Sequence, residues 1–406
     1  MARKRKTITP EDRQRALAVV VRQEHLLEDH LQRLAAIESH GNRVLHLDQL
    51  FVGLLLSFFD PIARSLRLIE DARDFGGRLN LPRLARSTTS DALAVFDPAA
   101  LKPIIDDLRD RVPGLACDDA DLATITRRII AGDGTYLSTL ADVAWALRQR
   151  PRGGKLKRQV RANVQMDVAS WTPQVVSISG DDGQSEPAAF APDLLRGVLY
   201  VFDRNFLDFA FLWQLLAKDN DFVLRVRANA PATRPVEARE LSAADREAGV
   251  VSDETVELTG GGAPGGLFRL VTIETLNRQG QPETIRLLSN LVGAEVAART
   301  IGTIYRLRWQ IELFFKWLKT WARMDHLLST SRNGITFQFY VAVIGVLMMY
   351  IQTGRRVSVY ALAALGRLAR GELTLEQAMA VIARRNHEAD LNQARQDRRR
   401  KQKKLV

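Results

Sequence analysis

Three acidic residues, Asp133, Asp203 and Glu312, stand where a carboxylate could do chemistry. Asp133 lies in AGDGTY at the end of a predicted strand, and Asp203 ends the apolar run GVLYVFD ahead of a predicted helix. Each aspartate also has an ordinary interpretation, since Asp-Gly suits a hairpin turn and Asp is a good helix cap. Taken together, three hard oxygen ligands at the ends of elements are what two divalent cations need to clamp a phosphoryl transfer.

Glu312 belongs to a polar stripe in the segment YRLRWQIELFFKWLK, residues 305–319. Tyr305, Arg308, Glu312 and Lys319 follow one another at helical spacing, and on a continuous helix they fall within an arc of roughly 60°. The apolar residues of the segment occupy the adjacent face. An ordinary Arg308–Glu312 ion pair on a solvated face is one interpretation. The other is phosphate handling, in which the cations hold phosphate oxygens and the carboxylate holds a metal ion.

The composition restricts which metal such a site could hold. There is one cysteine, Cys117, and the six histidines do not cluster at metal-ligand spacing. The residues therefore offer no thiolate or imidazole site, and a metal would have to be a hard cation held by carboxylates. We expect two ions of Mg²⁺ or Mn²⁺.

The charge of the chain indicates the kind of partner. The formal net charge is +11 and the sequence pI is about 10.0. This favours a polyanion, with nucleic acid first and a membrane surface second, and a merely basic soluble protein is the alternative. The longest apolar run, residues 337–350, is shorter than the roughly 18–20 residues of a membrane span. The N-terminus has no apolar stretch after its charges, so we expect a cytoplasmic protein.

The pattern along the chain predicts an α/β protein with added helical parts. A single helix from about residue 294 to 324 is predicted to carry Glu312. The predicted segments are a helical DNA-binding domain at 1–120, the first part of the α/β core at 121–229, a β-rich insertion at 230–288, the second part of the core with the Glu helix at 289–350, and C-terminal helices with a basic tail at 351–406.

Two further predictions concern the ends of the chain. Two short helices joined by the polar run 86–90 resemble a helix-turn-helix, although ordinary bundle helices give the same pattern. The helical pattern ends at about residue 385, and the tail from 384 to 406 is predicted to be mobile. Its many Lys and Arg residues would either add nonspecific phosphate contacts or only keep the protein soluble.

In this order, the motifs resemble the DDE transposases of bacterial insertion sequences. Tyr305, Arg308, Glu312 and Lys319 match the Y-x2-R-x3-E-x6-K signature of one subgroup, the family-four-like insertion-sequence transposases. Asp133-Gly134-Thr135 resembles the first Asp motif of the family, and residues 203–206, DRNF, resemble the second. The second motif usually reads Asp-Arg-Gly followed by an aromatic residue, so residue 205 departs from it. An asparagine there tolerates left-handed backbone better than most residues do.

The resemblance implies a fold and a reaction. The fold would be an RNase H-like catalytic core, interrupted by the β-rich insertion, with an N-terminal helical domain and C-terminal helices. The protein would bind double-stranded DNA at the inverted-repeat ends of the element, cleave it, and join the 3′-hydroxyl to target DNA as a homodimer in a synaptic complex. Asp133, Asp203 and Glu312 would bind two Mg²⁺ or Mn²⁺ ions, and the DNA-binding residues would be Tyr305, Arg308, Lys319 and Arg204.

Two other functions fit the same residues. One is a catalytically idle DNA-binding protein derived from a transposase, and the other is a nuclease of the same fold that cuts without joining. The intact acidic triad favours an active transposase, because a binding module does not need three carboxylates aimed at phosphates.

Overall fold

The computed structural model describes most of the chain in two compact units. One unit is formed by residues 113–316 and the other by residues 1–112 together with 317–406. The described residues are 24–37, 45–59, 85–112, 120–139, 143, 145–149, 157–180, 184–227, 233–277, 279–320, 324, 326–354 and 373–403, with 66, 70, 361, 363, 364 and 367. This division into two units differs from the five segments predicted from the sequence.

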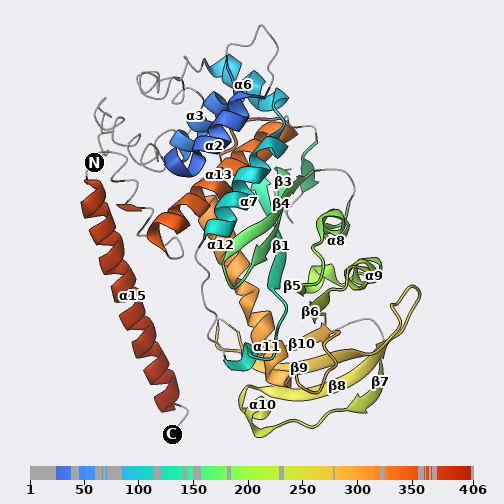
Figure 1. Ribbon diagram of the computed structural model, residues 1–406. Helices are drawn as coiled ribbons and strands as arrows, with labels where there is room; N and C mark the ends of the chain where they lie inside the picture. Colours follow the sequence, from blue (N-terminus) through green and yellow to red (C-terminus); the bar gives the residue numbers. More distant parts are fainter. Residues whose placement is uncertain are drawn as a thin grey trace. The chain divides into compact units, whose positions relative to one another are not determined.

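A large sheet forms the centre of the 113–316 unit (Figure 1). Its strands are β1 (Ile129–Ser138), β2 (Leu147–Gln149), β3 (Lys157–Asp167), β4 (Thr172–Ser179), β5 (Leu199–Phe202), β6 (Asp221–Val226), β7 (Thr233–Ala238), β8 (Val250–Leu258), β9 (Phe268–Leu276) and β10 (Pro282–Ser289). They follow the order β2-β3-β1-β5-β6-β10-β9-β8-β7, and β4 also pairs with β3. The predicted α/β class is confirmed, because helices accompany this sheet.

The middle of the sheet is parallel and its flanks are antiparallel. β5 lies between β1 and β6 and runs parallel to both. β3 is antiparallel to β1, and β10 is antiparallel to β6. The sequence of β5, LYVF, is buried at every position, as expected for a central parallel strand covered on both faces. The β-rich segment after β6 continues the same sheet, since β10 pairs directly with β6.

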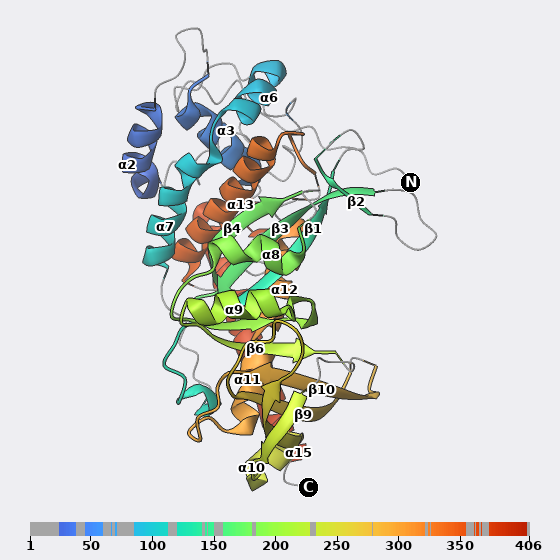
Figure 2. The same ribbon diagram turned by 90° about the vertical axis from the view of Figure 1, so that its right-hand side faces the viewer.

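Helices cover both faces of this sheet. α8 (Glu186–Phe190) and α9 (Phe209–Ala217) lie over one face, in front of the strands in Figure 2. α11 (Ala298–Leu307) packs against β5, β6, β9 and β10 on the other face (Figures 1 and 2). Two short 3₁₀ helices, η3 (Ala120–Leu122) and η5 (Arg204–Phe206), precede β1 and follow β5.

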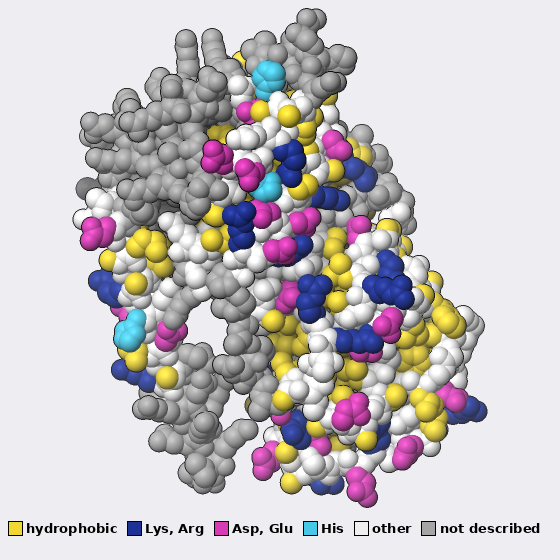
Figure 3. Space-filling view, in the orientation of Figure 1, with side chains coloured by type: hydrophobic (Ala, Val, Ile, Leu, Met, Phe, Trp, Pro, Cys, Tyr) yellow, Lys and Arg dark blue, Asp and Glu magenta, His cyan; other side chains and the backbone are white. Residues whose placement is uncertain are grey.

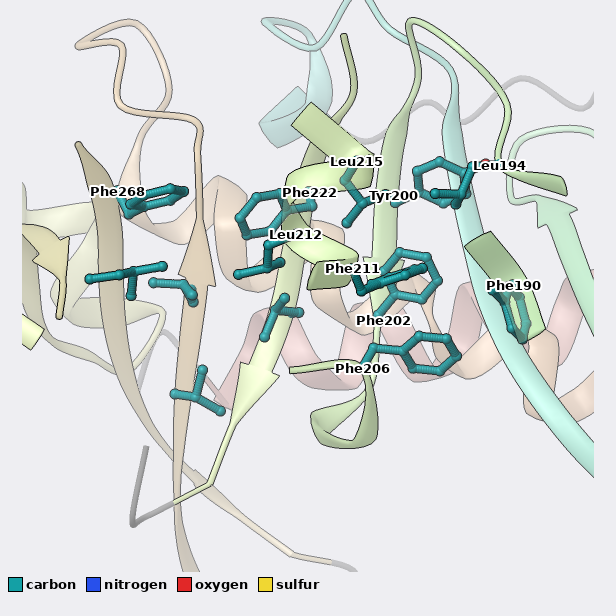
Figure 4. Close-up of a cluster of buried hydrophobic side chains, with 14 of the residues drawn as sticks. Phe190, Leu194, Tyr200, Phe202, Phe206, Phe211, Leu212, Leu215, Phe222 and Phe268 are labelled. Atoms are coloured by element: carbon teal, nitrogen blue, oxygen red, sulfur yellow. The ribbon is translucent and has the colours of Figure 1, made fainter. Parts of the chain in front are cut away.

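An aromatic cluster fixes the end of β5 (Figure 4). The Phe202 ring stacks on Tyr200 at 5.1 Å and on Phe206 at 4.4 Å between ring centroids, and it meets Phe211 edge-on at 5.3 Å. All four side chains are buried. Aromatic packing of this kind stabilises beyond the apolar area that it buries, so the strand end that leads into Asp203 is held firmly.

The predicted long helix is interrupted, and that prediction was wrong. The chain forms α11 up to Leu307 and a second helix, α12 (Trp309–Thr320), with the break at Arg308. The Arg308 N–H donates to the Tyr305 carbonyl at 3.1 Å, and Ile311 N–H donates to the Arg308 carbonyl at 3.1 Å. These bonds span three residues, so the turn is tighter than an α-helix and the axis need not continue. The single-helix arc through residues 305–319 therefore does not apply.

Helices make up the described part of the other unit. They are α2 (Glu24–Ala35), α3 (Leu47–Phe59), α6 (Arg86–Val95), η2 (Pro98–Leu101), α7 (Lys102–Arg111), α13 (Arg332–Thr353) and α15 (Leu375–Lys403). α13 packs against α3, α6, η2 and α7. By length and composition residues 332–352 of α13 could cross a membrane, but 83% of their most apolar window is buried in the protein. A helix that is apolar all round and buried in this way is the core of a bundle.

Two predictions about this unit are corrected. The run 86–90 is not a turn, because α6 begins at Arg86 and passes through Ser90 without a break. The chain also stays helical beyond residue 385, where the prediction ended it, since α15 continues to Lys403. Beyond residue 385 the helix is rich in Gln, Arg and Lys, which have high helix propensity and outweigh the lack of an apolar stripe there.

Candidate active site

Asp133 lies inside β1, not at the end of a strand. β1 pairs with β5 only as far as Ala131 and Val201, whereas its pairing with β3 continues to Ser138 and sets Asp133 opposite Val164. The strand prediction ended too early because β3 supports β1 beyond the point where β5 stops. The Asp-Gly hairpin is excluded for the same reason. The Asp133 side chain is 17% exposed, and its Oδ1 accepts a hydrogen bond from the Gly134 N–H at 2.8 Å.

Asp203 follows directly after β5 and caps the short helix η5. Its Oδ1 accepts a hydrogen bond from the Asn205 N–H at 2.8 Å. The aromatic cluster around Phe202 holds the end of β5, and β1 approaches β5 closely at this point. A methyl group on Gly132 would clash with the Phe202 ring, so glycine at 132 lets the two strands meet. The two aspartates thus emerge from neighbouring parallel strands, and Asp203 also does the ordinary capping work expected of it.

Arg308 connects the first aspartate to the glutamate. Its Nη1 lies 3.4 Å from Asp133 Oδ2, and its Nη2 donates to Glu312 Oε1 at 2.5 Å. The guanidinium carbon is 5.6 Å from the centre of the Tyr305 ring, within cation–π range. The helix break at residue 308 therefore places one cation between two carboxylates that are far apart in the sequence. Arg308 thus forms the predicted ion pair with Glu312 and a second ion pair with Asp133 on β1.

The surroundings of Asp133 disfavour its ionised form, chiefly because the group is desolvated. Burial is the largest influence and, with the nearby charges of Asp203 and Glu186, raises the pKa of Asp133 to about 7. Arg308 and the Gly134 N–H act in the opposite direction. One guanidinium thus does not compensate the carboxylates around it, and an additional cation would stabilise the ionised form of Asp133.

Glu186 is a functional candidate that the sequence did not reveal. It lies in the first turn of α8, and burial, followed by the charge of Asp203, raises its pKa against the opposing influence of Arg161. Its carboxylate lies against Gly134, where a methyl group would clash with Oε1. In the sequence, Ser185-Glu186-Pro187 is an ordinary helix start, so no signal separated this glutamate from any other first-turn acid.

The remaining predicted residues lie in different settings. Tyr305 lies in the last turn of α11, near Arg308, whereas Arg204 is exposed on η5. Lys319, in the last turn of α12, belongs to the unit made of 1–112 and 317–406. Within the described ranges, three or more Asp, Glu, His or Cys side chains do not come together as a metal-holding group. The Glu312 carboxylate is bound by Arg308 and does not join Asp133 in a metal-holding group. All three predicted ligands nevertheless offer the hard oxygens that Mg²⁺ prefers.

Charge elsewhere on the described surface is mixed. On the face drawn in Figure 3, Lys and Arg side chains lie interspersed with Asp and Glu. The net charge of +11 is therefore not gathered into one broad patch over the part of this face that the structure describes.

Comparisons with known proteins identify the family of the segment that contains these residues. The transposase DDE domain family matches residues 124–349, which include Asp133, Asp203 and Glu312. A putative transposase from Sinorhizobium fredii is 26% identical over 48% of this chain and 53% of its own length. A probable insertion-sequence transposase from Geobacillus stearothermophilus is 32% identical over 20% of this chain and 22% of its own length. A putative insertion-sequence transposase from a Synechocystis strain is 27% identical over 37% of this chain and 39% of its own length.

The matched segments thus span about half or less of each of these relatives. Among solved structures, a piggyBac transposase synaptic complex with hairpin DNA aligns with 95% of this chain and 75% of its own, at 11% identity and a TM-score of 0.37. A TM-score of this size does not establish a shared fold. The match to the family covers more than half of the chain, and this protein belongs to the transposase DDE domain family.

Proposed function

We propose that this protein is a DNA transposase that binds the inverted-repeat ends of an insertion sequence, cleaves them, and joins the 3′-hydroxyl to target DNA. The observation that carries the proposal is the link from Asp133 through Arg308 to Glu312, with Asp203 next to Asp133. Family membership supplies the class of enzyme, and this arrangement supplies the place for its chemistry. The signature of residues 305–319 supports the Y-x2-R-x3-E-x6-K subgroup.

The fold of the catalytic part is proposed to be an RNase H-like core. The parallel trio β1, β5 and β6, with the antiparallel β3 and β4 on one side, supports this assignment. The segment β7–β10 corresponds to the β-rich insertion, because it lies between β6 and the helices that carry Arg308 and Glu312.

Asp133, Asp203 and Glu312 are proposed to hold two Mg²⁺ or Mn²⁺ ions. The fit rests on their oxygen ligands and on the raised pKa of Asp133, which indicates a carboxylate short of positive charge. When bound, such ions would lower the pKa of water and stabilise the attacking and leaving oxygens of an in-line displacement. The buried aromatic cluster fixes the strand end that leads into Asp203, and pairing with β3 fixes Asp133. To take this role, Glu312 would have to release Arg308 and bind a metal ion instead.

Arg308 would then bind a phosphate group of the DNA. Its guanidinium is already held at the site, and a guanidinium can bind two oxygens of a phosphate group bidentately. Tyr305, Lys319 and the exposed Arg204 are proposed to add contacts to the DNA backbone, which position DNA without reading its sequence. The partners would be double-stranded transposon ends and target DNA, with a homodimer in the synaptic complex and a cytoplasmic location.

The proposed function is tested with a labelled duplex of the terminal repeat taken from DNA flanking the gene. Wild-type protein and Glu312→Gln are compared for cleavage and joining with Mg²⁺. We expect cleavage and joining in the wild type only, and none in EDTA. Binding without chemistry in both proteins would instead indicate an idle DNA-binding protein, and Mg²⁺-dependent cutting without joining would indicate a nuclease.

A further inference from the structure

Glu186 contacts both aspartate motifs of the site. Its Oε1 lies against Gly134, next to Asp133, and the side chain of Asn205, two residues after Asp203, lowers the pKa of Glu186. Glu186 thus lies between β1 and η5, at the point where the two aspartates approach each other. It is not a member of the predicted triad, and it comes from a third element, α8.

Gly134 gives Glu186 its space. Any side chain at 134 would clash with Glu186 Oε1, and its Cβ would lie 3.1 Å from Arg161 Cδ. The Gly134 backbone is not in a left-handed conformation, since its φ is not positive. Glycine here therefore gives the Glu186 carboxylate room to lie against β1, and backbone freedom is not its role. The Gly of the first Asp motif has the physical role of admitting Glu186.

Asn205 interacts with Asp203, Arg227 and Glu186. Its backbone N–H donates to Asp203 Oδ1 at 2.8 Å, its side-chain oxygen accepts from Arg227 Nη2 at 3.2 Å, and its side chain lowers the pKa of Glu186. A glycine, the usual residue at this place in the motif, would keep only the first of these. The asparagine that replaces the usual glycine at residue 205 thus has an interaction partner in Glu186.

Arg161 holds the start of α8 in place. Its side chain is buried, its Nη2 donates to the carbonyl of Ser185 at 3.3 Å, and its Nε donates to Asn163 Oδ1 at 3.0 Å. Ser185 is the N-cap of α8 and directly precedes Glu186. A buried cation fixed to β3 therefore sets the backbone position of Glu186 and balances part of its charge.

We propose that Glu186 is a positioning residue, which holds the Asp203 turn against the Asp133 strand through Asn205 and Gly134. Its catalytic consequence rests on the proposed transposase function, but its effect on the Asp203 turn does not. Removing it would leave the Asn205 side chain with Arg227 as its hydrogen-bond partner and would loosen the hydrogen bond between the Asn205 N–H and Asp203. The two carboxylates would then no longer keep a fixed separation.

The test combines two readouts on full-length protein. Hydrogen exchange of the Asn205 and Gly134 amides is measured without DNA or metal, and single-turnover cleavage of the terminal-repeat duplex is measured together with its Kd. The variants are Glu186→Ala, Glu186→Gln, Asn205→Gly and the Glu186→Ala/Asn205→Gly double variant. Glu240→Ala, at an exposed glutamate of the same unit, is the matched control.

For Glu186→Ala we expect the Asn205 amide to exchange about tenfold faster, which is the size of a lost charge-assisted hydrogen bond. Cleavage should slow about 10–100-fold, as for other residues that orient metal ligands, with an unchanged Kd for DNA. Glu186→Gln retains an acceptor for Asn205 and should recover most of the exchange protection. The double variant should be no slower than Glu186→Ala alone, because both changes break the same contact.

The outcomes separate the two proposals. If wild-type protein cleaves nothing, the proposed function fails, and the exchange rates alone decide whether Glu186 holds the turn. Exchange equal to that of wild type in Glu186→Ala overturns the positioning role, whatever the cleavage result. In an active wild type, faster exchange with unchanged cleavage overturns it as well. Additive losses in the double variant would contradict a shared contact.

Discussion

The two sides of the candidate site are built in different ways. The strand edge, which we define as Asp133 and Asp203 with β1 and β5, is held by sheet register and by a buried aromatic cluster. The helix junction, defined as Tyr305 to Glu312, is held by Arg308 ion pairs across a break between two helices. A packed strand edge cannot shift without breaking its core, whereas ion pairs can exchange partners. The comparison indicates a fixed side and an adjustable side, and in the proposed function the fixed side would hold the metal while the adjustable side would respond to DNA.

The largest effect is expected for Asp203→Asn at the strand edge. Asparagine keeps an oxygen that can accept the Asn205 N–H, so the cap should survive while the charge is lost. We expect cleavage to fall on the order of 10³-fold, since charge stabilisation is the main contribution at such a site. Single-turnover cleavage with Mg²⁺ measures this, and thermal unfolding checks that the fold is retained. Cleavage within a few fold of wild type would remove Asp203 from the site.

Phe202→Ala tests whether packing holds the strand edge. Phe202 is fully buried between Tyr200, Phe206 and Phe211, so its loss leaves a cavity and should cost about 3–5 kcal/mol of unfolding free energy. Urea denaturation measures the change. Leu276→Ala, at a residue that is 67% exposed, is the control and should lie within about 0.5 kcal/mol of wild type. Equal effects from both variants would mean that the cluster does not hold this edge.

Asp133→Asn should stabilise the metal-free protein at neutral pH. Because the folded pKa of Asp133 is raised to about 7, its contribution to stability is fully present below its unfolded value near 3.8 and is lost as pH rises toward 7. Asparagine does not ionise, so the unfolding free energy of the variant should rise relative to that of wild type between about pH 4 and 7. At pH 8 it should exceed the wild-type value by a few kcal/mol. Urea denaturation in EDTA across this range measures the difference. A gap that does not change with pH would contradict the raised pKa.

Arg308→Ala tests the helix junction and should have the smallest effect on stability. It leaves Asp133 and Glu312 without their shared cation, but Glu312 is 34% exposed and solvent screens part of the loss. We expect a cost of about 1–2 kcal/mol by urea denaturation, below that of Phe202→Ala. Arg246→Ala, at an exposed arginine of the short helix α10 (Ala243–Glu247), is the matched control. A cost above that of Phe202→Ala would reverse the comparison between the two sides.

Sequence patterns predicted the strand edge better than the helix junction. The apolar run before Asp203 has the composition of a buried parallel strand, and β5 has that role. The extent of β1 beyond Asp133 could not be predicted, because it depends on pairing with β3, about 30 residues away in the sequence. The break at Arg308 was missed because every residue around it suits a helix, and only contacts with a distant strand favour a tighter turn.

Glu186 shows a different limit of the sequence. Its site contact depends on the absence of a side chain at Gly134 and on the amide at Asn205, which are 52 and 19 residues away along the chain. No local pattern relates these three positions. By contrast, the spacing of Arg308 and Glu312 predicted their ion pair, since residues four apart on a helix are neighbours.

Iron-directed cleavage of the polypeptide tests the central claim, that both sides of the site serve one metal centre. Fe²⁺ replaces Mg²⁺ on oxygen ligands and, with peroxide and ascorbate, cuts the backbone close to where it binds. With terminal-repeat DNA present, we expect cuts near residues 133, 203 and 312 that Mg²⁺ suppresses and that Asp203→Asn abolishes. Without DNA, the cut near 312 should be weaker, because Arg308 holds Glu312. Cuts confined to other parts of the chain, or a cut near 312 that persists in Asp203→Asn, would contradict the account.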